Sequence, residues 1–189
     1  MNADTSTAQA QTPLADTRWR LDPSASTAEF RVPHFWGLVT VKGHFERLDG
    51  SLEVDHCGQR QMTLTIDAAS VHTGINQRDK HLRATAFFDT QNHPEVRFCS
   101  TSVGDIADNG IRVDGELEAA GERLAMTLEP TIHQTDDQLE IDVTTTVDQR
   151  QLGMTWSPLA MTKSPVTLTV HASLRRQSQT NKAREHEGF

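Results

Sequence analysis

Apolar residues alternate with polar residues along most of the chain between residues 28 and 174. A repeat of two is the repeat of a β-strand, whose successive side chains point to opposite faces of a sheet. One apolar and one polar face per strand is typical of antiparallel sheets with one buried side. The alternation therefore predicts an all-β domain. The runs that carry it are 28–32, 39–45, 52–54, 62–66, 96–98, 111–119, 124–132, 139–147 and 166–174.

Turn-forming residues separate these runs, and they predict successive hairpins. Gly115 and Pro130 interrupt long runs, and they predict bulges or edge positions that would let a sheet curl. The turn signals are Asp49-Gly50 and the short stretches 56–58, 108–110, 120–122 and 135–137.

One stretch between Ile66 and Val96 lacks the alternation. Asn76 is a residue type that caps helices, and Asp79 follows it three positions later as an acidic partner. We predict one short helix over about 77–85.

The expected strands are long, they follow one another as hairpins, and none is apolar on both faces. These properties favour a closed antiparallel barrel of about eight strands over a sandwich. Such a barrel has an interior that is either just filled or holds one small ligand. We expect the barrel domain at 18–175, between a disordered N-terminal arm, 1–17, and a disordered C-terminal tail, 176–189.

The net charge of −8 argues against nucleic acid or an anionic membrane as the main partner, because both attract basic surfaces. No segment has the length or apolarity of a membrane helix, and stable membrane insertion is not expected. The N-terminal residues show no secretory signal, so we expect a soluble, cytoplasmic, bacterial-type protein, with a periplasmic or secreted location as the disfavoured alternative. Cys57 and Cys99 are expected to be free thiols, although a bridge between them is the open alternative.

Asp79 and His81 are the one pair that could act as general acid and base. They lie two positions apart on the expected helix and so point to different sides. The simpler interpretation is that Arg78 and Asp79 tie the helix to the barrel rim by hydrogen bonds. The nine histidines show no metal-ligand spacing, and no nucleophile or phosphate-binding motif is present. We therefore predict no catalytic residues, no metal and no enzyme activity.

Large apolar residues cluster at 35–38, at 152–156 followed by 158–161, and at Phe87 and Phe88. They could plug the barrel ends as ordinary core, or they could form the mouth of an apolar cavity. The pattern leaves these two interpretations equal.

Taken in order, several segments resemble the YceI-like family of lipid- and polyisoprenoid-binding proteins. Arg-Asp-Lys-His-Leu at 78–82 and Phe-Phe-Asp at 87–89 are the most specific, and the resemblance covers about 19–174. At Leu152 the family often has an aromatic residue, which implies a different mouth shape here. The segments are 19–23, 26–35, 41–45, 66–74, 78–83, 87–89, 93–98 and 148–154.

This resemblance implies a lipocalin-like, eight-stranded barrel whose long apolar tunnel holds a polyisoprenoid, an isoprenoid quinone or a similar lipid. It implies no cofactor beyond that ligand, and it suggests a homodimer that no long apolar stripe demands. We expect the residues at inward strand positions to form the cavity wall: Phe30, Phe45, Leu64, Phe98, Leu117, Met126, Leu128, Ile141 and Val143. For the mouth or head group we nominate Phe35, Trp36, Arg78, His81, Leu82, Phe87, Phe88, Met154 and Trp156.

Three functions remain open from the sequence. The first is a lipid carrier or storage protein, and the second is an enzyme that uses Asp79 and His81. The third is an interaction module with a filled barrel. A continuous internal cavity would separate the third from the other two.

Overall fold

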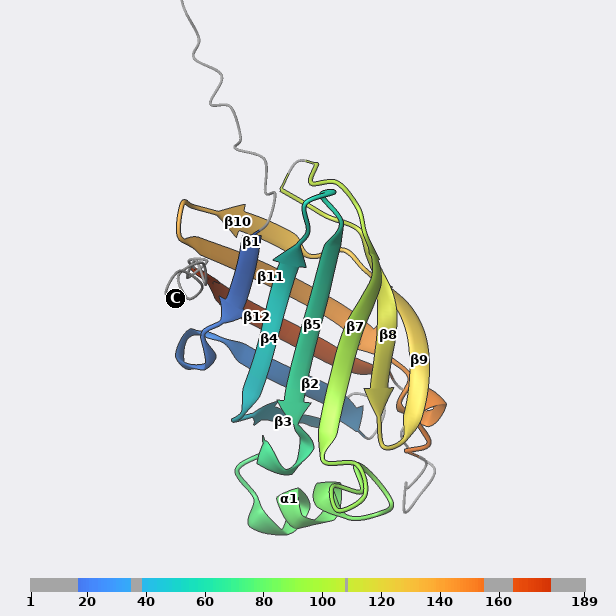
Figure 1. Cartoon of the computed structure of the whole chain (residues 1–189). Coiled ribbons are helices and arrows are strands. Elements are labelled where there is room, and N and C mark those ends of the chain that lie inside the picture. The colour runs from blue at the N-terminus through green and yellow to red at the C-terminus, as the bar shows by residue number, and fades with distance from the viewer. Residues whose placement is uncertain (1–16, 35–38, 108, 155–164, 178–189) are drawn as a thin grey trace, which may run out of the picture.

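The computed structural model describes residues 17–34, 39–107, 109–154 and 165–177 (Figure 1). Within them twelve strands form one antiparallel sheet, which confirms the all-β class. The predicted arm and tail, 1–17 and 176–189, lie almost wholly outside these residues. The strands are β1 (Thr17–Leu21), β2 (Thr27–His34), β3 (Val39–Phe45), β4 (Leu48–Val54), β5 (Arg60–Asp67), β6 (Val71–His72), β7 (Glu95–Val103), β8 (Val113–Ala119), β9 (Glu122–Leu128), β10 (Thr131–Gln134), β11 (Gln138–Val147) and β12 (Val166–Gln177).

The strands pair in the order β6-β3-β2-β12-β1-β4-β5-β7-β8-β9, while β10 pairs with β11 and β11 with β12. Figure 1 shows the sheet curved around an interior as a barrel. Hairpins join most neighbours, as predicted. The exception is β12, which pairs along one edge with β11 and along its other edge with β2 and then with β1. On their other edges β1 pairs with β4 and β2 with β3. The expected number of eight strands is too low. One run at 124–132 splits at Glu129 and Pro130 into β9 and β10, and the short β1 and β6 carry too little pattern to be recognised.

The predicted turns at 56–58, 120–122 and 135–137 are confirmed, since they join β4 to β5, β8 to β9 and β10 to β11. The prediction at Asp49-Gly50 is wrong, because both residues lie inside β4 and pair with β5. The expected bulge lies opposite Gly115 rather than in its strand, between Ser100 and Ser102 of β7. Gly115 itself gives room to a ring, since a Cβ there would lie 2.4 Å from Phe98 Cζ.

The described residues contain one α-helix, α1 (Asn76–Arg83), together with the short 3₁₀ turns η1 (Pro23–Ala25), η3 (Ala68–Ser70) and η4 (Gln149–Leu152). The predicted helix is confirmed with its start one residue earlier and its end two residues earlier. Asn76 is not its cap: Ile75 holds that position and makes no side-chain hydrogen bond. Asp79 instead accepts hydrogen bonds from the backbone N–H and the hydroxyl of Thr73, in the loop before the helix.

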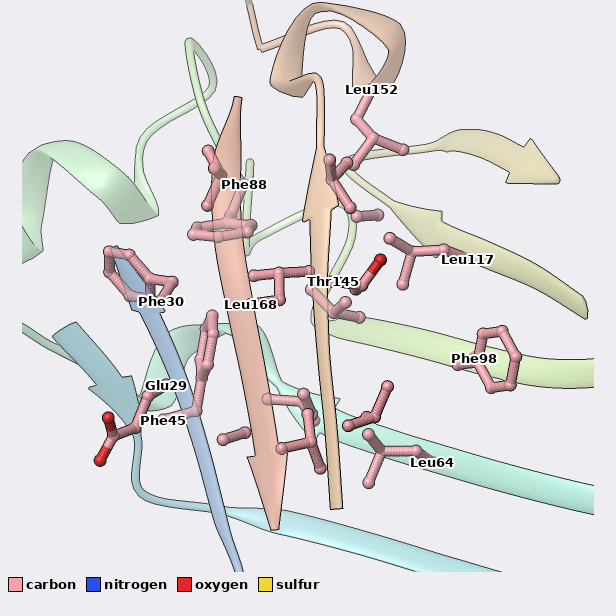
Figure 2. Close-up of a pocket in the computed structure, with 18 of the residues that line it drawn as sticks. Glu29, Phe30, Phe45, Leu64, Phe88, Phe98, Leu117, Thr145, Leu152 and Leu168 are labelled. Atoms are coloured by element: carbon pink, nitrogen blue, oxygen red, sulfur yellow. The ribbon is translucent and has the colours of Figure 1, made fainter. Parts of the chain in front are cut away.

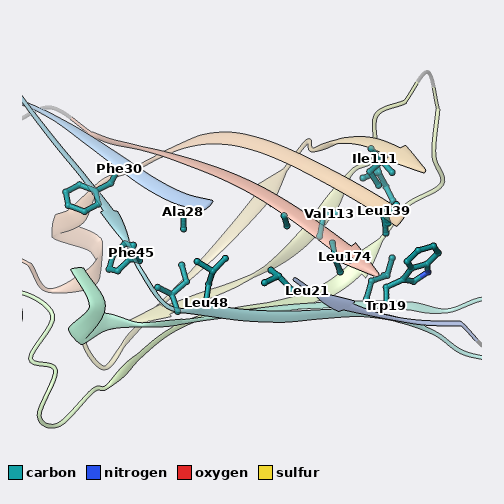
Figure 3. Close-up of a cluster of buried hydrophobic side chains, with 14 of the residues drawn as sticks. Trp19, Leu21, Ala28, Phe30, Phe45, Leu48, Ile111, Val113, Leu139 and Leu174 are labelled. Atoms are coloured by element: carbon teal, nitrogen blue, oxygen red, sulfur yellow. The ribbon is translucent and has the colours of Figure 1, made fainter. Parts of the chain in front are cut away.

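The most tightly packed part of the core closes the barrel end opposite α1 (Figures 1 and 3). Trp19, Val113 and Leu139 are at most 2% exposed there, and Ile111 and Ile132 pack with them. The void that remains among this end's side chains measures about 10 Å³. That is room for at most one water molecule, so this end of the barrel is solid.

Candidate functional site: an apolar cavity inside the barrel

A single cavity of about 760 Å³ occupies the other half of the barrel (Figure 2). Its wall comes mainly from strands around the sheet, and most of its residues are aliphatic or aromatic. The volume lies in the range of small-molecule binding sites. The interior of this barrel is therefore hollow along part of its length.

All nine predicted wall residues line this cavity. Alternation explains why they meet, since every second residue of a strand faces the same side and closure turns that side inward. Phe30 and Phe45 come from paired strands, and their ring centroids lie 5.8 Å apart. Whether these residues contact a ligand remains a prediction.

Six of the nine predicted mouth residues also line the cavity: Arg78, His81, Leu82, Phe87, Phe88 and Met154. The other three, Phe35, Trp36 and Trp156, lie outside the described residues. The clusters at 87–88 and 152–154 therefore combine both of the interpretations that the sequence left open: Leu152 and Met154 are buried core, and they also border the cavity.

The cavity reaches the surface beside α1. Ile75 lines it and is 52% exposed, and the exposed residues Gln77 and His81 line it as well. At the opposite end Trp19, Ile111 and Leu139 lie outside the lining and seal the barrel. The cavity is thus a blind pocket, with its mouth at the helix.

Hydrogen bonds to backbone carbonyls fix α1 at this mouth. Arg83 donates to the carbonyls of Ala69 and Val71, each at 2.7 Å, and Arg78 donates to the carbonyl of Thr73 at 2.9 Å. Arginine is suited to this role because its planar guanidinium presents several donors in fixed directions. The prediction that hydrogen bonds tie this helix to the rim is confirmed.

The proposed acid–base pair is not formed. The carboxylate of Asp79 is 2% exposed and faces Thr73 and His72, whose Nδ1 lies 3.4 Å from Asp79 Oδ2. His81 instead is exposed and packs edge-on against Phe87 at 6.2 Å between ring centroids. Their separation by two positions on a helix explains the outcome, as such residues project to different sides.

Sequence reasoning missed six polar residues of the lining: Glu29, Ser51, Thr63, Gln77, Thr145 and Gln149. Thr145 occupies an inward position of β11 between Val143 and Val147, beside its cross-strand partner Leu168, and Figure 2 shows it on the side of Leu117. Its position in the alternation indicated that Thr145 faces inward. It did not indicate a polar role, because threonine is common in strands for its β-branched shape alone.

The described residues offer no group of three or more His, Cys, Asp or Glu side chains arranged to hold a metal ion. Cys57 and Cys99 are both free, the first exposed and the second half-buried. Among the described helices, none is long and apolar enough to cross a membrane.

The composition of the wall decides what the cavity can hold. Most of the lining side chains are aliphatic or aromatic and have no hydrogen-bonding group. An apolar wall offers water few hydrogen bonds. The fold and site thus define a β-barrel whose interior suits an apolar guest.

The chain belongs to the YceI-like domain family, whose model matches residues 19–174. It is similar to Protein YceI of Escherichia coli O6:H1, with 35% identity over 111 residues that cover 57% of each chain. The chain spans about half the length of the curated relatives it matches.

Solved structures show the same fold. Burkholderia cenocepacia BcnA matches with a TM-score of 0.73 at 18% identity, covering 81% of this chain and 98% of that one. A domain from Saccharophagus degradans, described as a polyisoprenoid binding domain, matches with a TM-score of 0.64 at 18% identity, covering 85% of this chain and 98% of the other.

Proposed function

We propose that this protein binds a long-chain apolar lipid, a polyisoprenoid or an isoprenoid quinone, inside its barrel and acts as a carrier or storage protein. The observation that carries this proposal is the blind apolar cavity of 760 Å³ with its mouth beside α1. Family membership and the description of the Saccharophagus degradans domain support the same class of ligand.

Burial of apolar surface supplies the affinity. A prenyl chain has no hydrogen-bonding groups, so its binding rests on removal from water. At about 0.3 kcal/mol per heavy atom, a forty-carbon chain that fitted entirely would gain on the order of 12 kcal/mol. Thr145 and Gln149 add hydrogen-bonding groups to the wall, which suits a ligand with one polar end.

Two alternative functions receive less support. Catalysis by Asp79 and His81 lacks its geometry, because the carboxylate is engaged by Thr73 and His72. An interaction module with a filled barrel does not require a cavity of this volume.

Replacement of Met126 by Asp tests the proposal. Met126 lines the cavity from β9, while Ala125 on the same strand is exposed and outside the lining. A carboxylate facing a buried prenyl chain would be desolvated, so Met126→Asp should lower affinity more than about 100-fold. Ala125→Asp is the matched control, and it should bind like the unaltered protein.

The measurement is uptake of a long-chain prenyl alcohol and of a prenyl quinone from neutral detergent micelles, read by native mass spectrometry. Circular dichroism confirms that both variants are folded. A protein that takes up neither lipid would overturn the proposal, and so would equal uptake by the two variants.

A further inference from the structure

The cations that no carboxylate neutralises gather at one end of the barrel. Most described arginines form ion pairs with Asp or Glu, as Arg47 does with Asp67 at 2.7 Å and Arg20 with Asp49 at 2.8 Å. Among the described residues, a smaller group of cations has no carboxylate within ion-pair distance. Its members are Arg31, Lys42, Arg78, Lys80, Arg83 and Arg176.

Five of these six belong to elements at the mouth. Arg78, Lys80 and Arg83 lie on α1, and Figure 1 places β2 and β3 at the same end of the molecule. Arg31 of β2 and Lys42 of β3 are direct cross-strand partners, and both are exposed. Like charges in that relation repel each other and destabilise a sheet.

Acidic groups also lie at this end, and some of them are already engaged. Asp79 is buried and engaged by Thr73 and His72, and Asp67 is already paired with Arg47. The carboxylates of this end that have no described ion pair are Glu29, Glu46, Asp89 and Glu122, so the five cations stand among acidic groups rather than alone.

The opposite end of the barrel carries the reverse charge. Its loops hold Asp55, Asp105, Asp136 and Asp137, and of these the structure pairs Asp105 with Arg60. The net charge of −8 therefore averages over two unlike ends. At physiological ionic strength the Debye length is about 8 Å, so an approaching surface responds to the end it meets.

The basic rim surrounds the mouth of the apolar cavity. Ile75 is 52% exposed and lines the cavity, and it directly precedes α1, which carries three of the cations. A cationic surface with an exposed apolar side chain is the combination that binds the interface of an anionic bilayer.

We propose that the mouth end docks on the surface of a bilayer bearing anionic headgroups, where the cavity exchanges its apolar ligand. The inference rests on the proposed function, because it assigns the place at which the ligand enters and leaves. It also revises the expectation from net charge, which argued against an anionic membrane. Docking is peripheral and leaves the barrel outside the bilayer.

Co-sedimentation with vesicles tests the docking. The vesicles are pure phosphatidylcholine, or phosphatidylcholine mixed with phosphatidylglycerol at three parts to one, each at low and high salt. The protein should bind the mixed vesicles at low salt, lose binding at high salt, and ignore pure phosphatidylcholine.

Two charge reversals make a matched pair. Lys42→Glu changes the mouth and Arg176→Glu changes the last strand near the sealed end, and both residues are exposed and without a described carboxylate partner. Each removed basic charge near an anionic surface weakens binding about fivefold, so a change of two units gives about 25-fold for Lys42→Glu. Arg176→Glu should stay within about twofold.

Several outcomes would overturn the docking proposal. They are equal binding to the two kinds of vesicle, equal effects of the two reversals, and binding to polyglutamate in place of vesicles, which would identify an acidic protein segment as the partner. Failure of the docking is distinguishable from failure of the lipid-binding function. In the first case the protein takes up prenyl lipid from neutral micelles but ignores anionic vesicles, and in the second case the reverse holds.

Discussion

The two halves of this barrel are built by the same strands but packed in opposite ways. At the sealed end Trp19, Ile111 and Leu139 fill the interior and leave a void of about 10 Å³. Toward α1 the interior holds a cavity of about 760 Å³. Inward-facing apolar residues alone therefore do not decide whether a barrel is solid or hollow; the distance between opposing strands and the size of each side chain decide it.

The sealed half owes its solidity partly to β10, which lies across that end in Figure 1 and pairs with β11. Ile132 of β10 faces Ile141 in register and is 5% exposed. Toward the other end, β11 continues beyond β10 with Val143, Thr145 and Val147, which line the cavity. The break at Pro130 between β9 and β10 thus separates a packed region from an open one.

The largest expected effect follows from this contrast. Trp19→Ala should lower the free energy of unfolding by about 3–5 kcal/mol, because it opens a void in the solid half. Leu168→Ala should cost less than about 2 kcal/mol, since one side of Leu168 already faces the cavity and fewer contacts are lost. Urea unfolding measures both, and equal losses would contradict the division into two halves.

An intermediate effect is expected where Asp79 of α1 accepts hydrogen bonds from Thr73. Asp79→Ala leaves the half-buried Thr73 N–H without its acceptor, which should cost about 1–2 kcal/mol. Asp79→Asn keeps an acceptor oxygen and should cost about half as much. Urea unfolding together with hydrogen exchange at the Thr73 amide checks this. An unchanged exchange rate of the Thr73 amide in Asp79→Ala would show that Asp79 does not hold the loop before the helix.

The smallest effect is a pH dependence at η4, which carries Leu152 into the cavity wall. Hydrogen bonds from the Arg150 side chain, with its Nε 2.9 Å from Asp148 Oδ1, and from the Arg150 backbone N–H lower the pKa of Asp148 from 3.8 to about 2. A folded-state pKa below the ordinary value stabilises the fold above pH 3.8, and this contribution is lost as the pH falls toward 2.

Carbon-13 NMR titration of the Asp148 carboxyl group measures this directly. Arg150→Gln should raise its pKa toward 3.8, and Asp148→Asn should flatten the acid dependence of unfolding in this window. The effect on stability is small, because the pair is exposed to solvent. An unshifted Asp148 resonance in Arg150→Gln would contradict the assignment.

The alternation of apolar and polar residues predicted the strands and their inward faces. It is a local property, and the curvature of the sheet into a barrel buries the apolar face of each strand. Phe30, Phe98 and Met126 could be placed on the inner face from their neighbours alone. The hollow could not be predicted that way, since it depends on how far apart opposing strands lie. The pairing of β12 with β1 and β2 could not be predicted either, because strand partners distant in sequence leave no local pattern.

Errors at single residues had local causes. Asp49-Gly50 has a turn composition, but Gly50 sits within β4 where a Cβ would lie 2.8 Å from the Thr63 carbonyl oxygen. Asn76 was a suitable cap, yet the tertiary contact between Asp79 and Thr73 fixes the first turn instead. The cations of the mouth could not be recognised from the sequence, because the fold pairs Arg31 with Lys42 and brings β2, β3 and α1 to the same end of the molecule.

The position of β12 has a consequence for how the chain is made. This strand pairs with β1, β2 and β11, so residues near both ends of the described chain share one ladder. A ribosome releases Val166–Gln177 only after the earlier strands have emerged, and until then β1 and β2 lack their common neighbour. Such non-local pairing slows folding and leaves apolar strand faces exposed in the nascent chain. The barrel therefore assembles late in synthesis, when its last strand arrives.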